Sequence, residues 1–163
     1  MPEPSPAGAP LTLWRGTVLS AWVDYNGHLS DAYYMVAFSM STDALMDHIG
    51  LDAAGRARTG HSIFTLEAHV NYLLEVKQDA PIEVRTQLLG ADAKRLQVFH
   101  QMFRQGSDAP LAVSEQMLLC VDMAQRRSAP FPPEVAAQVA ALARAHAQLA
   151  APPYSGRRIA LPG

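Results

Sequence analysis

The sequence predicts an α+β fold in which one antiparallel sheet is wrapped around a long central helix. A helical apolar pattern over residues 31–49 is followed by four segments in which apolar and polar residues alternate. The connections between these segments are too short for parallel crossovers, so neighbouring strands are expected to be antiparallel. A single sheet of this kind buries its apolar face most simply on the one long helix.

The predicted helix over residues 31–49 is apolar on nearly every face. Ser30 or Asp31 can cap its start, and Gly50 can end it in a left-handed conformation. The apolar positions are Tyr33, Tyr34, Met35, Val36, Ala37, Phe38, Met40, Leu45 and Ile49. A helix with this pattern is expected to be buried on most sides.

The predicted strands lie before and after this helix. Residues 12–19 are expected to form the first strand, and the polar residues after it a loop. The later alternating segments are residues 64–72, 82–88, 96–103 and 111–121. Pro132 and Pro133 then open a second helix, because proline suits the first helical turn. A sheet of about five strands has two edges that need cover, so a homodimer or a dimer of dimers is expected.

The bulk composition is that of one folded domain. The chain has 163 residues, of which 49% are hydrophobic and 17% charged. Residues 1–10 are expected to form a flexible arm, residues 11–150 the domain with its terminal helix, and residues 151–163 a tail. The net charge of -2 and the lack of a basic stripe argue against a nucleic-acid partner.

The sequence also argues against secretion and membrane insertion. Cys120 is the only cysteine, so no internal disulfide can form, which fits a cytoplasmic protein. The N-terminus lacks the basic start and apolar core of a secretory signal. The longest apolar uncharged run, between Asp31 and Asp43, is far shorter than the roughly 20 residues that span a bilayer. A cytoplasmic protein without membrane contact is expected.

Several motifs of common enzyme chemistry are absent from the sequence. It contains no glycine-rich dinucleotide fingerprint, no phosphate-binding loop with a lysine and no Gly-x-Ser-x-Gly elbow. The six histidines lie far apart and form no His-Glu-x-x-His motif. We therefore expect neither a metal ion nor a cofactor.

One loop, directly before the predicted helix, places several reactive groups close together. Asp24, Asn26, Gly27 and His28 lie within five residues. The N–H groups at a helix start can hold the oxyanion that forms when a carbonyl is attacked. An ionised Asp beside them can attack that carbonyl or activate a water. The same residues also make a good turn, and on spacing alone the turn is the favoured interpretation.

The motif Asp-x-Asn-Gly-His before a tyrosine-rich helix resembles the active-site loop of hot-dog thioesterases of the 4-hydroxybenzoyl-CoA thioesterase class. The order of elements from about Leu11 to Val121 is also similar to that fold. The resemblance implies that Asp24 is the catalytic carboxylate, in a loop with Asn26 and His28. It also implies that the N–H of Asp31, or of a neighbour, is the oxyanion donor. The family often has two asparagines where this chain has Ser30 and Asp31.

A second resemblance, to betainyl-CoA thioesterases, covers nearly the whole chain. It is carried by residues 24–29, 64–69, 89–96 and 129–132. That group is linked with carnitine breakdown and implies betainyl-CoA as the substrate, with coenzyme A as part of the substrate. Aromatic faces and an acid can hold its quaternary ammonium. The candidates for this role are Trp22, Tyr25, Tyr33, Tyr34, Phe64 and Glu67, and Tyr72 belongs to the same group of aromatic residues.

Two pairs of basic residues are candidates for binding the phosphates of coenzyme A. They are Lys94 with Arg95 and Arg126 with Arg127, and each pair is expected to lie in a turn. Paired basic residues in turns are mostly only solvated, just as aromatic residues on a buried helix are mostly core. Both interpretations stay open at this point.

Two further functions are compatible with the fold. Hot-dog acyl-CoA hydratases resemble Asp-x-Asn-x-x-His, in which His follows Asp by five positions. Here His28 follows Asp24 by four, and Gly27 occupies the place of a branched residue, which argues against dehydration chemistry. A non-catalytic acyl-CoA-binding module is the third candidate.

Overall fold

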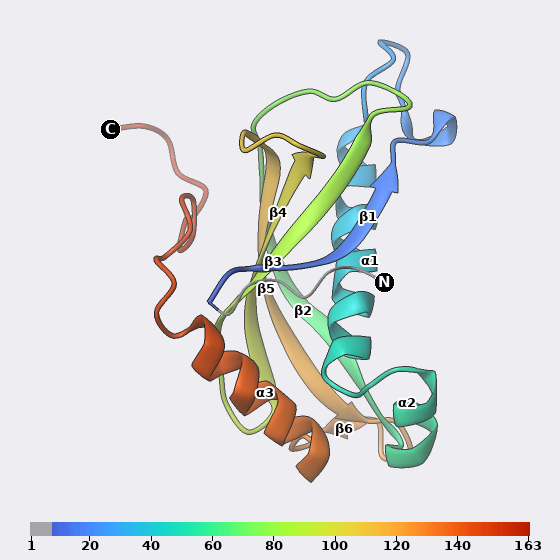
Figure 1. Cartoon of the computed structure of the whole chain (residues 1–163), viewed down its shortest axis with the longest axis vertical. Coiled ribbons are helices and arrows are strands. Elements are labelled where there is room, and N and C mark those ends of the chain that lie inside the picture. The colour runs from blue at the N-terminus through green and yellow to red at the C-terminus, as the bar shows by residue number, and fades with distance from the viewer. Residues whose placement is uncertain (1–7) are drawn as a thin grey trace.

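The computed structural model describes residues 8–163 (Figure 1). Residues 1–7 of the predicted arm lie outside this range. The elements, in chain order, are β1 (Leu11–Thr17), a 3-10 helix (Ser20–Trp22), α1 (Asp31–His48), α2 (Ala53–Thr59), β2 (His61–Tyr72), β3 (Pro81–Ala91), β4 (Arg95–Arg104), β5 (Pro110–Asp122), β6 (Arg127–Ser128) and α3 (Pro133–His146).

The strands form one antiparallel sheet with the order β1-β3-β4-β5-β2, and the short β6 pairs with β5. Helix α1 runs along one face of this sheet, here called the inner face (Figure 1). Helix α3 packs beside β3, near the end where β3 meets β4 (Figure 1), and its Val135 and Val139 share a buried cluster with Leu45 and Ile49 at the end of α1. The predicted α+β fold, with a sheet curled around one long helix, is therefore confirmed.

Helix α1 occupies the place that its apolar pattern predicts, but one chain covers only part of it. Phe38 is fully buried against inner-face residues, and Gly50, with a φ of 94°, follows the helix end. Met40 keeps 38% of its surface exposed, and Val36 is only half-buried. The sheet contacts one side of the helix, so burial on most sides is not achieved within a single chain.

A buried polar cluster joins α1 to the sheet. His100 on β4 has no exposed surface, and its ring stacks on Phe38 with centroids 5.9 Å apart. The Nε2 atom lies 3.0 Å from Oγ1 of Thr42, and Nδ1 lies 2.9 Å from Oγ1 of Thr86. Burial lowers the pKa of His100 to about 3, so the ring is neutral at physiological pH. Both ring nitrogens therefore help to fix α1 on β3 and β4.

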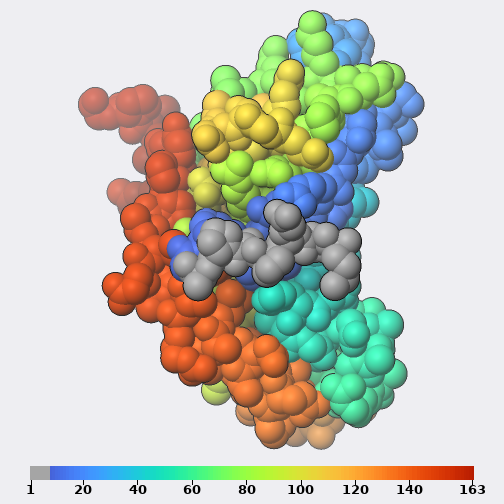
Figure 2. Space-filling view, viewed as in Figure 1, coloured from blue at the N-terminus to red at the C-terminus, as the bar shows by residue number. Residues whose placement is uncertain are grey.

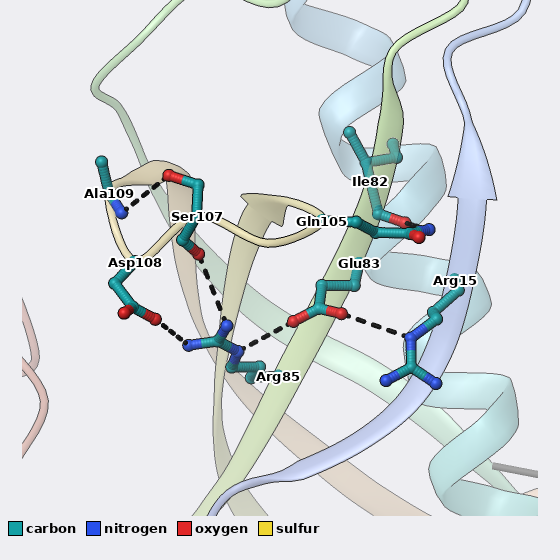
Figure 3. Close-up of polar contacts among 8 residues, drawn as sticks. All are labelled: Arg15, Ile82, Glu83, Arg85, Gln105, Ser107, Asp108 and Ala109. Carbon is teal, nitrogen blue, oxygen red and sulfur yellow. Dashed lines mark hydrogen bonds and ion pairs between the residues drawn. The ribbon is translucent and has the colours of Figure 1, made fainter.

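An ion-pair chain on the outer face holds the edge strand β1 to β3 (Figure 3). The buried carboxylate of Glu83 accepts hydrogen bonds from Nε of Arg15 at 3.2 Å and Nε of Arg85 at 3.0 Å. Arg85 also pairs with Asp108 at 3.2 Å, and its guanidinium lies 4.1 Å from the centre of the Phe103 ring. The Glu83 carboxylate thus has two cationic partners, which offset the cost of burying it.

The C-terminal residues have no helix or strand, yet they pack on the outer face. The amide of Gln87 donates to the carbonyl of Ala150 at 3.1 Å. The N–H of Gly156 donates to the Glu115 carboxylate at 3.0 Å, and Pro152 is buried. Figure 2 shows this tail running from α3 along one side of the molecule. The proposed division at residues 10 and 150 stays a prediction.

Candidate active site

The loop between the 3-10 helix and α1 is a small hairpin. Val23 and Leu29 form a β-bridge. The N–H of Ser30 donates to the carbonyl of Trp22 at 2.9 Å, and that of Asp24 to His28 at 2.9 Å. Its turn contains Gly27 with a φ of 75°, a conformation that glycine adopts without strain. Because Trp22 and Leu29 are buried, the hairpin fixes Asp24 relative to the start of α1.

The carboxylate of Asp24 is exposed and is held through one of its two oxygens. Its Oδ1 accepts hydrogen bonds from the N–H of Asn26 at 2.8 Å and from the N–H of His28 at 3.4 Å. Within residues 8–163, Oδ2 has no hydrogen-bond partner. The hydrogen bonds that form the turn therefore leave the second carboxylate oxygen of Asp24 available.

The first amides of α1 differ in whether they have an acceptor. The N–H of Ala32 donates to Oδ1 of Asp31 at 2.9 Å, and the N–H of Tyr33 donates to the carbonyl of Ser30 at 3.0 Å. The N–H of Asp31 has no acceptor in the described part of the chain. One amide at the positive end of the helix dipole is thus available to a ligand.

The aromatic candidates of the loop and helix divide into core and surface residues. Trp22 is buried and stacks on Tyr33, with ring centroids 5.9 Å apart. Tyr34 is buried, and its hydroxyl donates to the carbonyl of Leu74 at 3.1 Å; desolvation, followed by the charge of Glu75, raises the pKa of Tyr34. Tyr25 is 97% exposed on the hairpin. Trp22 and Tyr34 thus belong to the core, whereas Tyr25 lies on the surface.

Tyr72, one of the aromatic residues that the sequence grouped around the proposed site, lies at the start of α1. Its hydroxyl donates to the carbonyl of Asp31 at 3.2 Å, and its ring meets Tyr34 edge-on with centroids 5.3 Å apart. The ring is half-exposed, and desolvation together with the charge of Asp31 raises the pKa of Tyr72. The feature of the sequence that pointed to Tyr72 was its aromatic side chain at the end of the alternating segment that forms β2.

The ring of His28 contacts Glu75 rather than Asp24. Its Nε2 lies 3.4 Å from a carboxylate oxygen of Glu75, and a β-bridge joins His28 to Lys77. His28 and Asn26 therefore touch Asp24 through their backbone amides rather than their side chains. An Asp–His acid–base pair, as a hydratase would need, is not formed in this structure.

Within one chain, the structure does not bring the remaining candidates to Asp24. Phe64 lines a hollow with Arg126 near the opposite end of β2, and Glu67 lies on the outer face in a hollow with Glu115 and Arg157. The Nζ of Lys94 lies 3.4 Å from Ser128, beside Arg127, and Arg95 pairs with Asp92. The basic candidates therefore gather at the sheet end opposite the Asp24 loop (Figure 1). Their roles stay predictions.

No metal or membrane feature is visible in the described residues. Within residues 8–163, no three His, Cys, Asp or Glu side chains gather as a metal site would require. No helix in the same range has the length and apolar character that would let it cross a membrane.

Residues 18–139 match the sequence profile of the thioesterase-like superfamily. This match covers more than half of the chain, so the chain belongs to that family and is a thioester hydrolase with the hot-dog fold. A betainyl-CoA thioesterase of Pseudomonas aeruginosa is 57% identical to this chain over 152 residues, which are 93% of this chain and 96% of that protein.

Two further relatives complete the comparison. An L-carnitine dehydrogenase/betainyl-CoA thioesterase of Rhizobium meliloti is 39% identical over 153 residues; the match covers 94% of this chain and 31% of that larger protein. A Staphylococcus aureus protein solved in complex with CoA superimposes with a TM-score of 0.85 at 28% identity, covering 97% of this chain and all of that one. The expected resemblance to hot-dog thioesterases, and to betainyl-CoA thioesterases among them, is therefore confirmed.

Proposed function

We propose that this protein hydrolyses betainyl-CoA to betaine and coenzyme A. The proposal rests on two groups near the start of α1, Oδ2 of Asp24 and the N–H of Asp31. Neither of them has a hydrogen-bond partner within residues 8–163. The similarity to the P. aeruginosa betainyl-CoA thioesterase supports the choice of acyl group. No cofactor takes part in the proposed reaction.

The proposed mechanism places the thioester carbonyl between Asp24 and the start of α1. The N–H of Asp31 donates to the carbonyl oxygen, and the helix dipole stabilises the negative charge that develops there. Hydrogen bonds from Asn26 and His28 orient Oδ1 of Asp24 and leave Oδ2 to react.

Two routes are open from this geometry. In the first, Oδ2 takes a proton from a water whose oxygen attacks the carbonyl carbon; the C–S bond then breaks, and the thiolate receives that proton. In the second, Oδ2 itself attacks and the thiolate leaves; water then hydrolyses the resulting anhydride, which regenerates Asp24, and the thiolate takes up one of the protons released from that water. Both routes yield a free carboxylate and a free thiol.

We also propose that the site is completed by a second copy of the chain in a cytoplasmic homodimer. In residues 8–163, β2 pairs only with β5, so its other edge is open. Phe64 and Leu66 on β2, and Met40 on α1, are exposed. Antiparallel pairing of two β2 edges sets the basic end of one sheet beside the Asp24 loop of the other. Lys94, Arg95, Arg126 and Arg127 would then be available to CoA phosphates from across the interface. A dimer of two such dimers is the alternative assembly.

The test is release of free thiol from a panel of acyl-CoA thioesters. The decisive pair is betainyl-CoA and 3,3-dimethylbutyryl-CoA, in which carbon replaces the cationic nitrogen. We expect betainyl-CoA to be preferred by roughly ten- to a thousandfold in kcat/KM, because each well-placed ring contributes about 0.5–2 kcal/mol to binding a cation. Equal efficiency would contradict the choice of acyl group. Hydration of an enoyl-CoA without thiol release would instead support a hydratase, and CoA-ester binding without turnover a binding module.

A further inference from the structure

The carboxylate of Asp31 has no cationic partner in the described part of the chain. It is exposed, and its Oδ1 accepts hydrogen bonds from the N–H of Ala32 at 2.9 Å and from the hydroxyl of Ser30 at 3.3 Å. No Lys, Arg or His nitrogen of residues 8–163 lies within 4.0 Å of it. A negative charge therefore stands at the helix start without a counterion from the protein.

This charge is unfavourable for thioester hydrolysis in general. The amide proposed to hold the oxyanion belongs to Asp31 itself, so the carboxylate and the developing negative charge are only a few bonds apart. Two like charges at such a separation repel each other. A neutral acyl group offers nothing to offset this repulsion.

A cationic acyl group changes the sign of the interaction. In a betainyl thioester, one methylene separates the quaternary nitrogen from the carbonyl carbon. When the carbonyl oxygen is at the N–H of Asp31, the nitrogen must lie in the vicinity of the Asp31 carboxylate. A trimethylammonium group has no N–H to donate, so charge attraction and contact with aromatic faces are the means of recognising it.

The half-exposed ring of Tyr72 is held beside Asp31 by a hydrogen bond. The hydroxyl of Tyr72 donates to the carbonyl of Asp31 at 3.2 Å, and the edge-on contact with the buried Tyr34 fixes the ring position. The Tyr72 side chain is 51% exposed, so part of its ring is accessible to a ligand. Glu67, the acid that the sequence favoured for this role, lies on the outer face of its own chain with Glu115 and Arg157.

We infer that Asp31, with Tyr72 beside it, determines specificity by favouring a quaternary ammonium acyl group and disfavouring a neutral one. This inference rests on the proposed function, in which the N–H of Asp31 binds the carbonyl oxygen. Asp31 thus contributes its backbone to catalysis and its side chain to substrate choice.

The test compares kcat/KM for betainyl-CoA and 3,3-dimethylbutyryl-CoA in Asp31→Asn and in wild type. Asparagine keeps the oxygen that caps Ala32 and removes only the charge. We expect the preference for the cationic substrate, measured as the ratio of the two kcat/KM values, to fall roughly ten- to a hundredfold. Tyr72→Leu should lower the same preference. Asp43→Asn, an exposed position further along α1, is the matched control and should keep the wild-type preference.

Each outcome decides between distinct conclusions. An unchanged preference in Asp31→Asn would show that the charge of Asp31 does not select the substrate. If that unchanged preference comes with equal losses in kcat/KM for both substrates, Asp31 acts only as a helix cap. Either result overturns this inference and leaves the proposed function intact if wild type prefers betainyl-CoA. A wild-type enzyme that hydrolyses both esters equally overturns the inference together with the proposed acyl group.

Discussion

The N–H of Asn26 lies 2.8 Å from Oδ1 of Asp24 and donates a hydrogen bond to it within a tight, exposed turn. This contact satisfies one carboxylate oxygen and leaves the other oxygen without a partner in residues 8–163. The turn that made a purely structural role credible therefore also orients the carboxylate that we propose as the reacting group.

The first prediction concerns Asp24→Asn. The amide oxygen of asparagine can still accept from the N–H groups of Asn26 and His28, so the loop should keep its shape. Loss of the charge should lower kcat for thiol release by about a hundredfold or more, because a general base or nucleophile is removed. The thermal midpoint should stay near that of wild type. Near-normal turnover in this variant would exclude Asp24 from the chemistry.

The second prediction concerns Phe38→Asp. Phe38 is fully buried between α1 and the sheet, against His100. A carboxylate there would be unpaired and desolvated, so we expect a loss of more than about 4 kcal/mol in unfolding free energy, seen as insolubility or loss of the cooperative transition. Ser39→Asp, one residue further along and exposed, is the control and should melt close to wild type. A soluble Phe38→Asp protein with a normal melt would contradict the packing of α1.

The sequence predicted the main elements because their periodicities are long and regular. The apolar pattern of residues 31–49 became α1, and the four alternating segments became β2 to β5. Helix α2 was missed because it has only seven residues and contains Gly55. Its signals were local: Asp52 accepts from the N–H of Gly55 at 2.8 Å, and Gly60, with a φ of 69°, ends the helix.

The site was predicted less completely, and β2 shows why. A bulge between Thr65 and Glu67 changes the side-chain alternation, so the pattern does not continue from Phe64 to Val70. Ile63 before the bulge and Val70 after it both pack in the inner-face core, although their positions differ in parity. Periodicity cannot show such a bulge. The Asp24 loop was found because its residues are adjacent in sequence.

The third prediction concerns the pH dependence of stability. The pKa of His100 is about 3 in the folded state, because of burial, against 6.5 for an ordinary histidine. The unfolded chain therefore binds a proton that the folded chain does not. The stability that follows is fully present above pH 6.5 and is lost as pH falls toward 3. Between pH 7 and pH 5, this single group should lower the unfolding free energy by about 2 kcal/mol.

Denaturant titrations of wild type and His100→Gln at both pH values isolate this effect. The variant removes the titrating ring, while the other ionisable groups contribute equally to both proteins. Its stability at pH 7 should be lower, because the contacts with Thr42 and Thr86 are lost. Its further loss on going to pH 5 should be about 2 kcal/mol smaller than that of wild type. Parallel acid losses in the two proteins would show that His100 is not buried as described.

The last prediction concerns the open edge of β2. Phe64 is 48% and Leu66 57% exposed on this strand, and an apolar edge of this kind favours pairing with a second strand. Light scattering at micromolar concentration should therefore give at least twice the 17.7 kDa of one chain. Leu66→Lys places a charge on the edge and should shift the protein toward monomers, with thiol release falling in parallel because the basic end of the second copy is lost. Leu161→Lys, at a 94% exposed position in the tail, should change neither mass nor activity. A fully active 17.7 kDa species would instead show that one chain holds the whole site.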